Sequence, residues 1–101
     1  MPLLYVRKEV FQWLREGEKT IDVRKGNSFH GNIAVFQCGP RVLRFKIEKR
    51  ESGQLLEILR LDNFREVIPT AFELDNAVRY LQRIYGNYDG VFTAYYIAPL
   101  E

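Results

Sequence analysis

The sequence predicts an α+β fold: a small barrel or strongly curved sheet of mostly antiparallel strands, with two or three short helices covering its ends. Three observations predict it. The chain has 101 residues, which suits one domain, and we assign residues 1–101 to it. Several short strand-like segments are separated by turn residues. Hydrophobic residues make up 47% and charged residues 28% of the chain, a composition typical of a packed core.

The first quarter of the chain predicts a strand, a helix and a second strand. Residues 3–7 are mostly apolar and open the sheet. Over residues 8–16 the apolar side chains recur at spacings of three and four, and Gly17 follows where a helix cap is expected. Residues 18–24 are rich in β-branched side chains and predict the next strand.

The middle of the chain predicts two further strands. Residues 33–38 form a continuous apolar run that suits a central strand. Residues 42–49 alternate, so that Phe45 points toward the core and Arg44 and Lys46 point toward water. Half of this strand surface is therefore expected to be basic and exposed.

The last third predicts helices and a closing strand. Residues 52–61 fit either a hairpin strand or a helix, and the Leu-rich composition favours the helix. Thr70 and Glu73 match a capping box, which predicts that a helix begins at Thr70 and ends before Gly86. Residues 91–97 are mostly apolar or aromatic at odd and even positions alike, so both faces of this segment are expected to be buried. They therefore predict an inner strand.

Composition excludes several function classes. Cys38 and His30 are the single Cys and the single His, too few for a structural zinc site or a disulfide, so we expect no metal and no cofactor. No apolar run is long enough for a membrane span and the first residues do not resemble an export signal, so we expect a cytoplasmic protein with no membrane partner. The net charge of +2 permits a nucleic-acid partner without requiring one.

Residues 17–24 carry the densest group of ionisable side chains. Lys19, Asp22 and Arg24 fit two interpretations, a solvated strand face with weak ion pairs or the edge of a binding pocket. On an ideal strand Lys19 lies opposite Asp22 and Arg24, so a pocket requires a twist or bulge near Thr20.

The pattern Gly17-x-Lys19-Thr20-x-Asp22-x-Arg24 resembles the Gly-x-Lys-x-x-Glu-x-Arg signature of the ASCH domain. Asp22 replaces the commoner Glu. The order of the flanking elements is similar along nearly the whole chain. The resemblance implies a PUA-like β-barrel, and ASCH proteins are similar to RNA-binding PUA domains.

The first functional hypothesis is therefore an RNA- or nucleotide-binding module with a basic cleft, whose partner is RNA or a nucleoside or nucleotide. The exposed strand face and the end of the first strand add further cations. The expected ligand-binding residues are Lys19, Thr20, Asp22, Arg24, Arg7, Arg44 and Lys46.

Two alternatives remain. Some small ASCH members resemble amidohydrolases or ribonucleases, and in a metal-independent hydrolase of a modified nucleoside or RNA the catalytic residues here would be Lys19 and Asp22. Asp22, however, stands where the amidohydrolase pattern has Thr, and a carboxylate is a poor nucleophile for amide hydrolysis. The other alternative is an interaction module with a vestigial cleft. Either a monomer or a homodimer fits the sequence.

Overall fold

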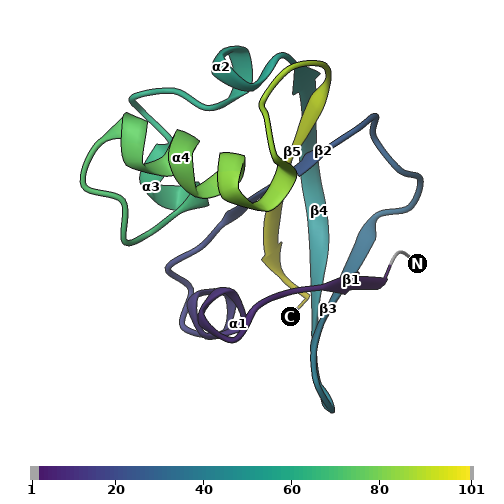
Figure 1. Cartoon of the computed structure of the whole chain (residues 1–101). Coiled ribbons are helices and arrows are strands. Elements are labelled where there is room, and N and C mark those ends of the chain that lie inside the picture. The colour runs from purple at the N-terminus through teal and green to yellow at the C-terminus, as the bar shows by residue number, and fades with distance from the viewer. Residues whose placement is uncertain (1–2, 101) are drawn as a thin grey trace.

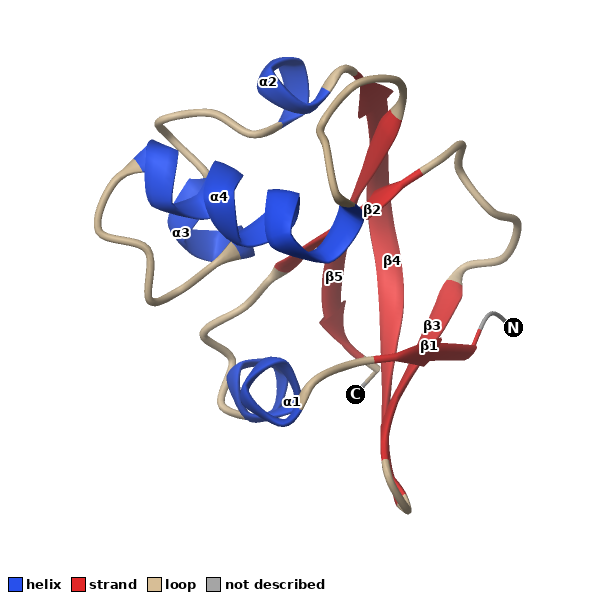
Figure 2. Ribbon diagram, viewed as in Figure 1, coloured by secondary structure: helices blue, strands red, loops and turns tan. Residues whose placement is uncertain are grey.

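Five strands form one mixed sheet in the order β1-β3-β4-β5-β2, which curves into half of a barrel (Figures 1 and 2). The structure is a computed structural model and describes residues 3–100. Strand β1 runs parallel to β3, and the other three pairs are antiparallel. The elements are β1 Leu3–Tyr5, α1 Lys8–Arg15, β2 Ile21–Lys25, β3 Ile33–Cys38, β4 Arg41–Gly53, α2 Leu55–Ile58, α3 Phe64–Val67, α4 Leu74–Tyr85 and β5 Phe92–Pro99.

The register defines two faces of the sheet. Directly opposed residues of an antiparallel pair carry their side chains on the same face. Asp22 lies opposite Tyr95, and Tyr95 lies opposite Arg50, so these three share what we call the Tyr95 face. The other side is the Phe92 face, named for Phe92, which lies opposite Lys25.

A β-bulge in β4 changes which residues reach the Tyr95 face. The register shifts between Ile47 and Lys49, leaving Glu48 as the extra residue. Ile47 therefore shares the Tyr95 face with Arg50 and Ser52, although Ile47 and Arg50 are three positions apart. The Ser52 Oγ atom lies 2.8 Å from the Thr93 Oγ1 atom, which places both residues on that face.

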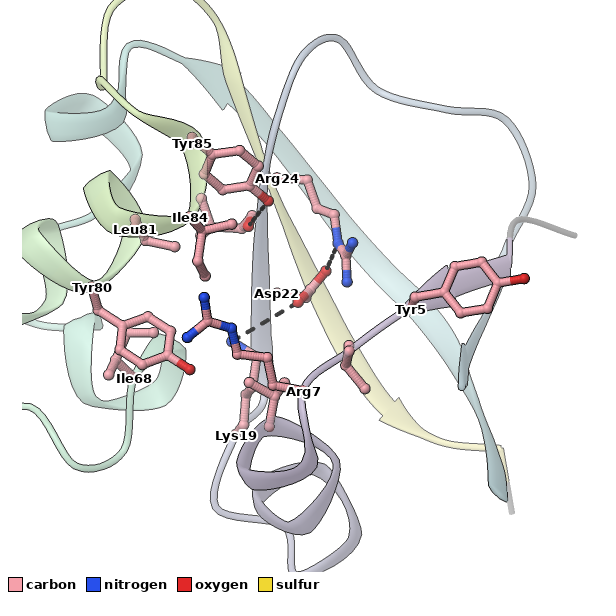
Figure 3. Close-up of a pocket in the computed structure, with 13 residues that line it drawn as sticks. Tyr5, Arg7, Lys19, Asp22, Arg24, Ile68, Tyr80, Leu81, Ile84 and Tyr85 are labelled. Atoms are coloured by element: carbon pink, nitrogen blue, oxygen red, sulfur yellow. Dashed lines mark hydrogen bonds and ion pairs between the residues drawn. The ribbon is translucent and has the colours of Figure 1, made fainter. Parts of the chain in front are cut away.

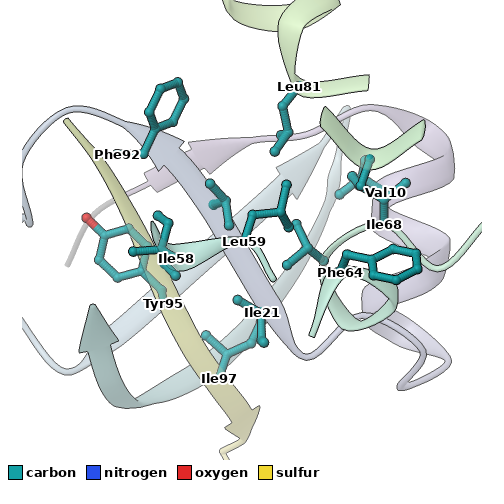
Figure 4. Close-up of a cluster of buried hydrophobic side chains, with 14 of the residues drawn as sticks. Val10, Ile21, Ile58, Leu59, Phe64, Ile68, Leu81, Phe92, Tyr95 and Ile97 are labelled. Atoms are coloured by element: carbon teal, nitrogen blue, oxygen red, sulfur yellow. The ribbon is translucent and has the colours of Figure 1, made fainter. Parts of the chain in front are cut away.

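The helices bury both faces of the sheet. α4 packs on the Phe92 face, where the rings of Tyr85 and Phe92 meet edge to face at 5.7 Å. Ile21 and Phe92 are fully buried there (Figure 4). Complete burial of such a side chain stabilises the fold by about 1.5–3 kcal/mol. Helix α1 packs against β3, whose Phe36 side chain is also fully buried.

Several element boundaries differ from those expected. The predicted helix at 8–16 is confirmed as α1, and Gly17 has a φ of +78°. Residues 52–61 combine both expectations, because β4 continues to Gly53 and one helical turn, α2, follows. The turn α3 was not expected, so four helices replace two or three across residues 3–100.

The expected capping box at Thr70 is wrong. α4 begins at Leu74 with Glu73 as its N-cap, and Asn76 Oδ1 accepts a hydrogen bond from the Glu73 backbone N–H at 2.9 Å. Glu73 is therefore the cap rather than the third residue of the helix. Among the described residues, no helix is both long and apolar enough to cross a membrane.

Candidate functional site

A pocket of about 360 Å³ lies between the two edge strands, where the end of β1 and helix α1 approach β2 and α4 (Figure 3). Its wall combines charged, aromatic and aliphatic side chains from segments far apart in the sequence. The lining residues are Tyr5, Val6, Arg7, Val10, Lys19, Asp22, Val23, Arg24, Ile68, Tyr80, Leu81, Ile84 and Tyr85.

A buried carboxylate with two cations forms the charged part of the pocket. The Arg24 Nε atom donates to Asp22 Oδ2 at 2.7 Å, and the Lys19 Nζ atom lies 3.9 Å from Asp22 Oδ1. Lys19 and Asp22 are each only 4% exposed, while the Arg24 side chain is 26% exposed. Such deeply buried ionic groups are rare unless they are paired.

Lys19 reaches this cluster because it precedes the strand. β2 begins only at Ile21, so strand alternation does not fix the direction of the Lys19 side chain. After the turn at Gly17, the Lys19 backbone N–H donates to the Trp13 carbonyl at 3.1 Å. The Lys19 ammonium donates to the Val67 carbonyl at 2.5 Å. The expected twist or bulge near Thr20 is thus unnecessary.

Burial changes the proton affinity of Lys19. Loss of hydration lowers its pKa from 10.5 to about 8, an effect that Asp22 opposes and Arg24 reinforces. Burial also disfavours the charge of Arg24, but the charge and hydrogen bond of Asp22 outweigh it and raise the pKa of Arg24. At neutral pH the ammonium form of Lys19 therefore still predominates, and the pocket retains both cations.

Two tyrosines from α4 line the opposite wall. The Tyr80 hydroxyl donates to Glu9 Oε2 of α1 at 3.1 Å, and the Arg7 guanidinium lies 5.9 Å from the centre of the Tyr80 ring. Burial, followed by Glu9, raises the pKa of Tyr80 to about 12. The Tyr85 hydroxyl donates to the Val23 carbonyl at 3.4 Å. Both rings are neutral surfaces beside the charged cluster.

The pocket is positively charged and offers free donors. The pocket lining contains three cationic side chains, Arg7, Lys19 and Arg24, and one carboxylate, Asp22. The resulting charge of +2 equals the formal net charge of the whole chain. The Arg24 terminal NH₂ groups make no hydrogen bond to the described residues. A guanidinium with a free fork of donors suits a phosphate or carboxylate.

The structure brings together only part of the predicted ligand-binding set. Arg7 joins Lys19, Asp22 and Arg24 in the pocket, whereas Thr20 is exposed and lies outside it. Arg44 and Lys46 are exposed on the Phe92 face of β4, also outside the pocket, where Lys46 Nζ lies 3.9 Å from Glu48 Oε2.

Sequence reasoning missed the Tyr80 wall of the pocket. Tyr80 lies on α4, far along the chain from Lys19, and no local pattern relates the two positions. Tyr85 lies on the same helix, and no local pattern predicts its place in the pocket either. Within residues 3–100, no three His, Cys, Asp or Glu side chains gather in a way that could hold a metal ion.

The comparisons with known proteins show a shared fold. The chain is similar to the crystal structure of the hypothetical protein PH0355, with a TM-score of 0.79 and 17% sequence identity over 97% of each chain. No model of a protein family matches the sequence, and no curated protein matches it. At this level of identity, the likeness concerns the arrangement of the whole chain and not its ligand.

Proposed function

We propose that the protein binds RNA or a nucleotide in this pocket, as a PUA-like domain of the ASCH type. One observation carries the proposal: Lys19, Asp22 and Arg24 converge in a pocket with surplus positive charge and tyrosine walls. A volume of about 360 Å³ falls in the range of about 300–1,000 Å³ common for small-molecule sites.

The chemistry of a nucleotide matches the pocket group by group. The free donors of Arg24 and the exposed guanidinium of Arg7 suit phosphate oxygens. Asp22 Oδ1 has no hydrogen-bond donor within the described residues, since Lys19 is 3.9 Å away, so it can accept from an exocyclic amine of a base. A base can stack on the ring of Tyr80.

The signature resemblance supports the same ligand class. The three charged positions of the pattern Gly17-x-Lys19-Thr20-x-Asp22-x-Arg24 form one cluster in the pocket. Thr20, which the ASCH signature leaves variable, lies outside the pocket. The curved five-stranded sheet is compatible with a PUA-like barrel.

Replacing Arg7 tests the binding site without disturbing the core. Arg7 is exposed and lines the pocket, and Arg44 is exposed on the sheet outside it. We expect Arg7→Ala to weaken binding of single-stranded RNA about 10- to 100-fold, because a charge-assisted hydrogen bond contributes about 1.5–3 kcal/mol. Fluorescence anisotropy at fixed salt measures the affinity.

The matched control is Arg44→Ala, which removes the same charge from a different surface. Its affinity should stay within about twofold of the wild type. Equal losses in both variants would indicate non-specific attraction and would contradict a pocket-centred site.

Hydrolysis of a modified nucleoside is the second candidate, favoured by the lowered pKa of Lys19. A Lys with a pKa of about 8 supplies some neutral amine near neutral pH, and this amine can act as a base. If the site is hydrolytic, incubation with N-acetylated cytidine should release cytidine, detectable by chromatography. Lys19→Met should abolish the release, and absence of product with wild-type protein would exclude this substrate.

A further inference from the structure

The Tyr95 face continues from the pocket across β5 to β4. Asp22, which lines the pocket, lies opposite Tyr95, and Tyr95 lies opposite Arg50. Two residues along each strand, a second row on the same face contains Arg24, Thr93 and Ser52. Neighbouring strands are about 4.8 Å apart, so Arg50 lies about two such steps from the pocket wall.

Arg50 has a buried donor without a partner. Its Nε atom is buried and makes no hydrogen bond to the described residues. Buried polar atoms are nearly always hydrogen-bonded, and an unpaired one calls for a specific explanation, of which a bound ion is one. Arg50 can therefore donate a hydrogen bond to an anion or a carbonyl group beside the pocket.

The aromatic ring of Phe29 covers Tyr95 next to this donor. The two rings stack with their centres 4.2 Å apart and their planes 15° from parallel. This is the geometry in which a nucleic-acid base stacks on an aromatic side chain. Tyr95 is only 2% exposed beneath this cover.

Phe29 lies in the middle of a loop whose two ends are hydrogen-bonded to the sheet. The loop between β2 and β3 includes Gly26 and Gly31, which have φ values of +113° and +103°. Among the described contacts of residues 27–31, one hydrogen bond joins the loop to the sheet. In it, the Phe29 backbone N–H donates to the Tyr95 hydroxyl at 3.2 Å. Withdrawal of Phe29 therefore breaks this hydrogen bond and the ring stack, and it exposes apolar surface that packs against the core.

We propose that Tyr95 and Arg50 form a second nucleotide subsite, which Phe29 fills in the absence of ligand. The inference rests on the proposed binding of RNA in the adjoining pocket. The nucleotide next to the one in the pocket stacks its base on Tyr95 in place of Phe29, and Arg50 donates to its phosphate or to a base carbonyl. A mononucleotide leaves the Phe29 stack intact, whereas a longer single strand displaces it.

Two variants and two probes test the subsite. The probes are a mixture of the four nucleoside 5′-monophosphates and a mixed-sequence tetranucleotide RNA. Phe29→Ala should bind the tetranucleotide about three- to tenfold more tightly, because the competing ring is absent. Arg50→Met should bind it about tenfold more weakly. Neither variant should alter mononucleotide affinity by more than about twofold.

Matched controls separate the subsite from general effects. Lys49→Met removes the same charge from the adjacent residue, whose Nζ lies 4.8 Å from the centre of the Tyr96 ring on the Phe92 face. Phe72→Ala removes an exposed ring elsewhere. Both should bind the tetranucleotide as the wild type does. If Phe29→Ala does not fold, Phe29→Leu gives the same comparison with a weaker stack.

The outcomes distinguish the two proposals. If mononucleotides bind through Arg7 but Phe29→Ala weakens tetranucleotide binding or leaves it unchanged, the pocket stands and the subsite is overturned. Equal losses in Arg50→Met and Lys49→Met would also overturn it. If neither probe binds the wild-type protein, both proposals fail.

Discussion

Asp22 is the residue on which the charged cluster depends. It is 4% exposed, and its two carboxylate oxygens face different cations, Oδ2 toward Arg24 and Oδ1 toward Lys19. Without that carboxylate, the two cations would repel each other in a poorly hydrated site. Asp in place of the commoner Glu shortens the side chain by one methylene group, yet Asp22 still contacts Arg24 at 2.7 Å.

The lowered pKa of Lys19 predicts a pH dependence of stability. In the unfolded chain Lys19 titrates near 10.5, and in the folded protein near 8. Between these values the unfolded chain binds more protons, so the free energy of unfolding rises with pH. Relative to Lys19→Met, the wild type should gain on the order of 3 kcal/mol between pH 8 and 10.5, at about 1.4 kcal/mol per pH unit.

Chemical denaturation of both proteins from pH 6 to 10.5 measures this difference. Well below pH 8 the difference between wild type and Lys19→Met should be constant, because Lys19 is then protonated in both the folded and unfolded states. A difference that stays constant up to pH 10.5 would contradict the lowered pKa of Lys19.

The contacts at the start of α4 predict which of two overlapping capping motifs stabilises the helix. Asn76 accepts a hydrogen bond from the Glu73 backbone, whereas Thr70 is exposed and precedes the helix by four residues. Asn76→Ala should therefore lower the free energy of unfolding by about 1 kcal/mol. Thr70→Ala is the control and should change it by less than about 0.3 kcal/mol. A larger loss in Thr70→Ala would place the helix start at the sequence-predicted cap.

The cap also shows where sequence reasoning fails at the scale of an element. Thr70 with Glu73 and Glu73 with Asn76 have the same spacing of three, and tertiary packing rather than local preference selects between them. In β4 the alternation of Phe45 with Arg44 and Lys46 was predictable, and the exposure of these residues confirms it. The bulge at Glu48 was not predictable, because its cause is pairing with β5.

The bulge determines which polar residues of β4 lie beside Tyr95 and Thr93 on the Tyr95 face. Without the extra residue, Lys49 and Glu51 would replace Arg50 and Ser52 beside Tyr95 and Thr93. A register that places Ser52 against Thr93 also permits their hydrogen bond at 2.8 Å. The bulge thus places Arg50, rather than Lys49, beside Tyr95 in the proposed subsite.

At the scale of the whole molecule, the candidate pocket is a product of long-range contacts. The cluster around Lys19 was predictable because its members lie within six residues of one another. Tyr80 was not predictable, since only the folded chain brings α4 beside α1. Arg7 was predicted from charge alone, and its place beside Tyr80 follows from the same contact.

The distribution of charge predicts how salt affects RNA binding. Each cation that contacts a phosphate of a single strand contributes about 0.7 to the slope of log affinity against log salt concentration. Arg7→Ala should therefore make the slope for the tetranucleotide shallower by about 0.7. The double variant Arg44→Ala/Lys46→Ala, which alters only the exposed strand surface, should leave the slope unchanged. Anisotropy titrations from about 50 to 300 mM salt measure both slopes, and a shallower slope in the double variant would extend the site onto β4.

The position of the pocket between β1 and β2 has a mechanical consequence. These strands are the two edges of the sheet and do not pair with each other, so the distance between them is not set by a backbone ladder. The described contacts across the gap include the Tyr80–Glu9 hydrogen bond and the approach of Arg7 to the Tyr80 ring. The width of the pocket is therefore set by contacts outside the strand ladder, and a change in these contacts would leave every strand pairing intact.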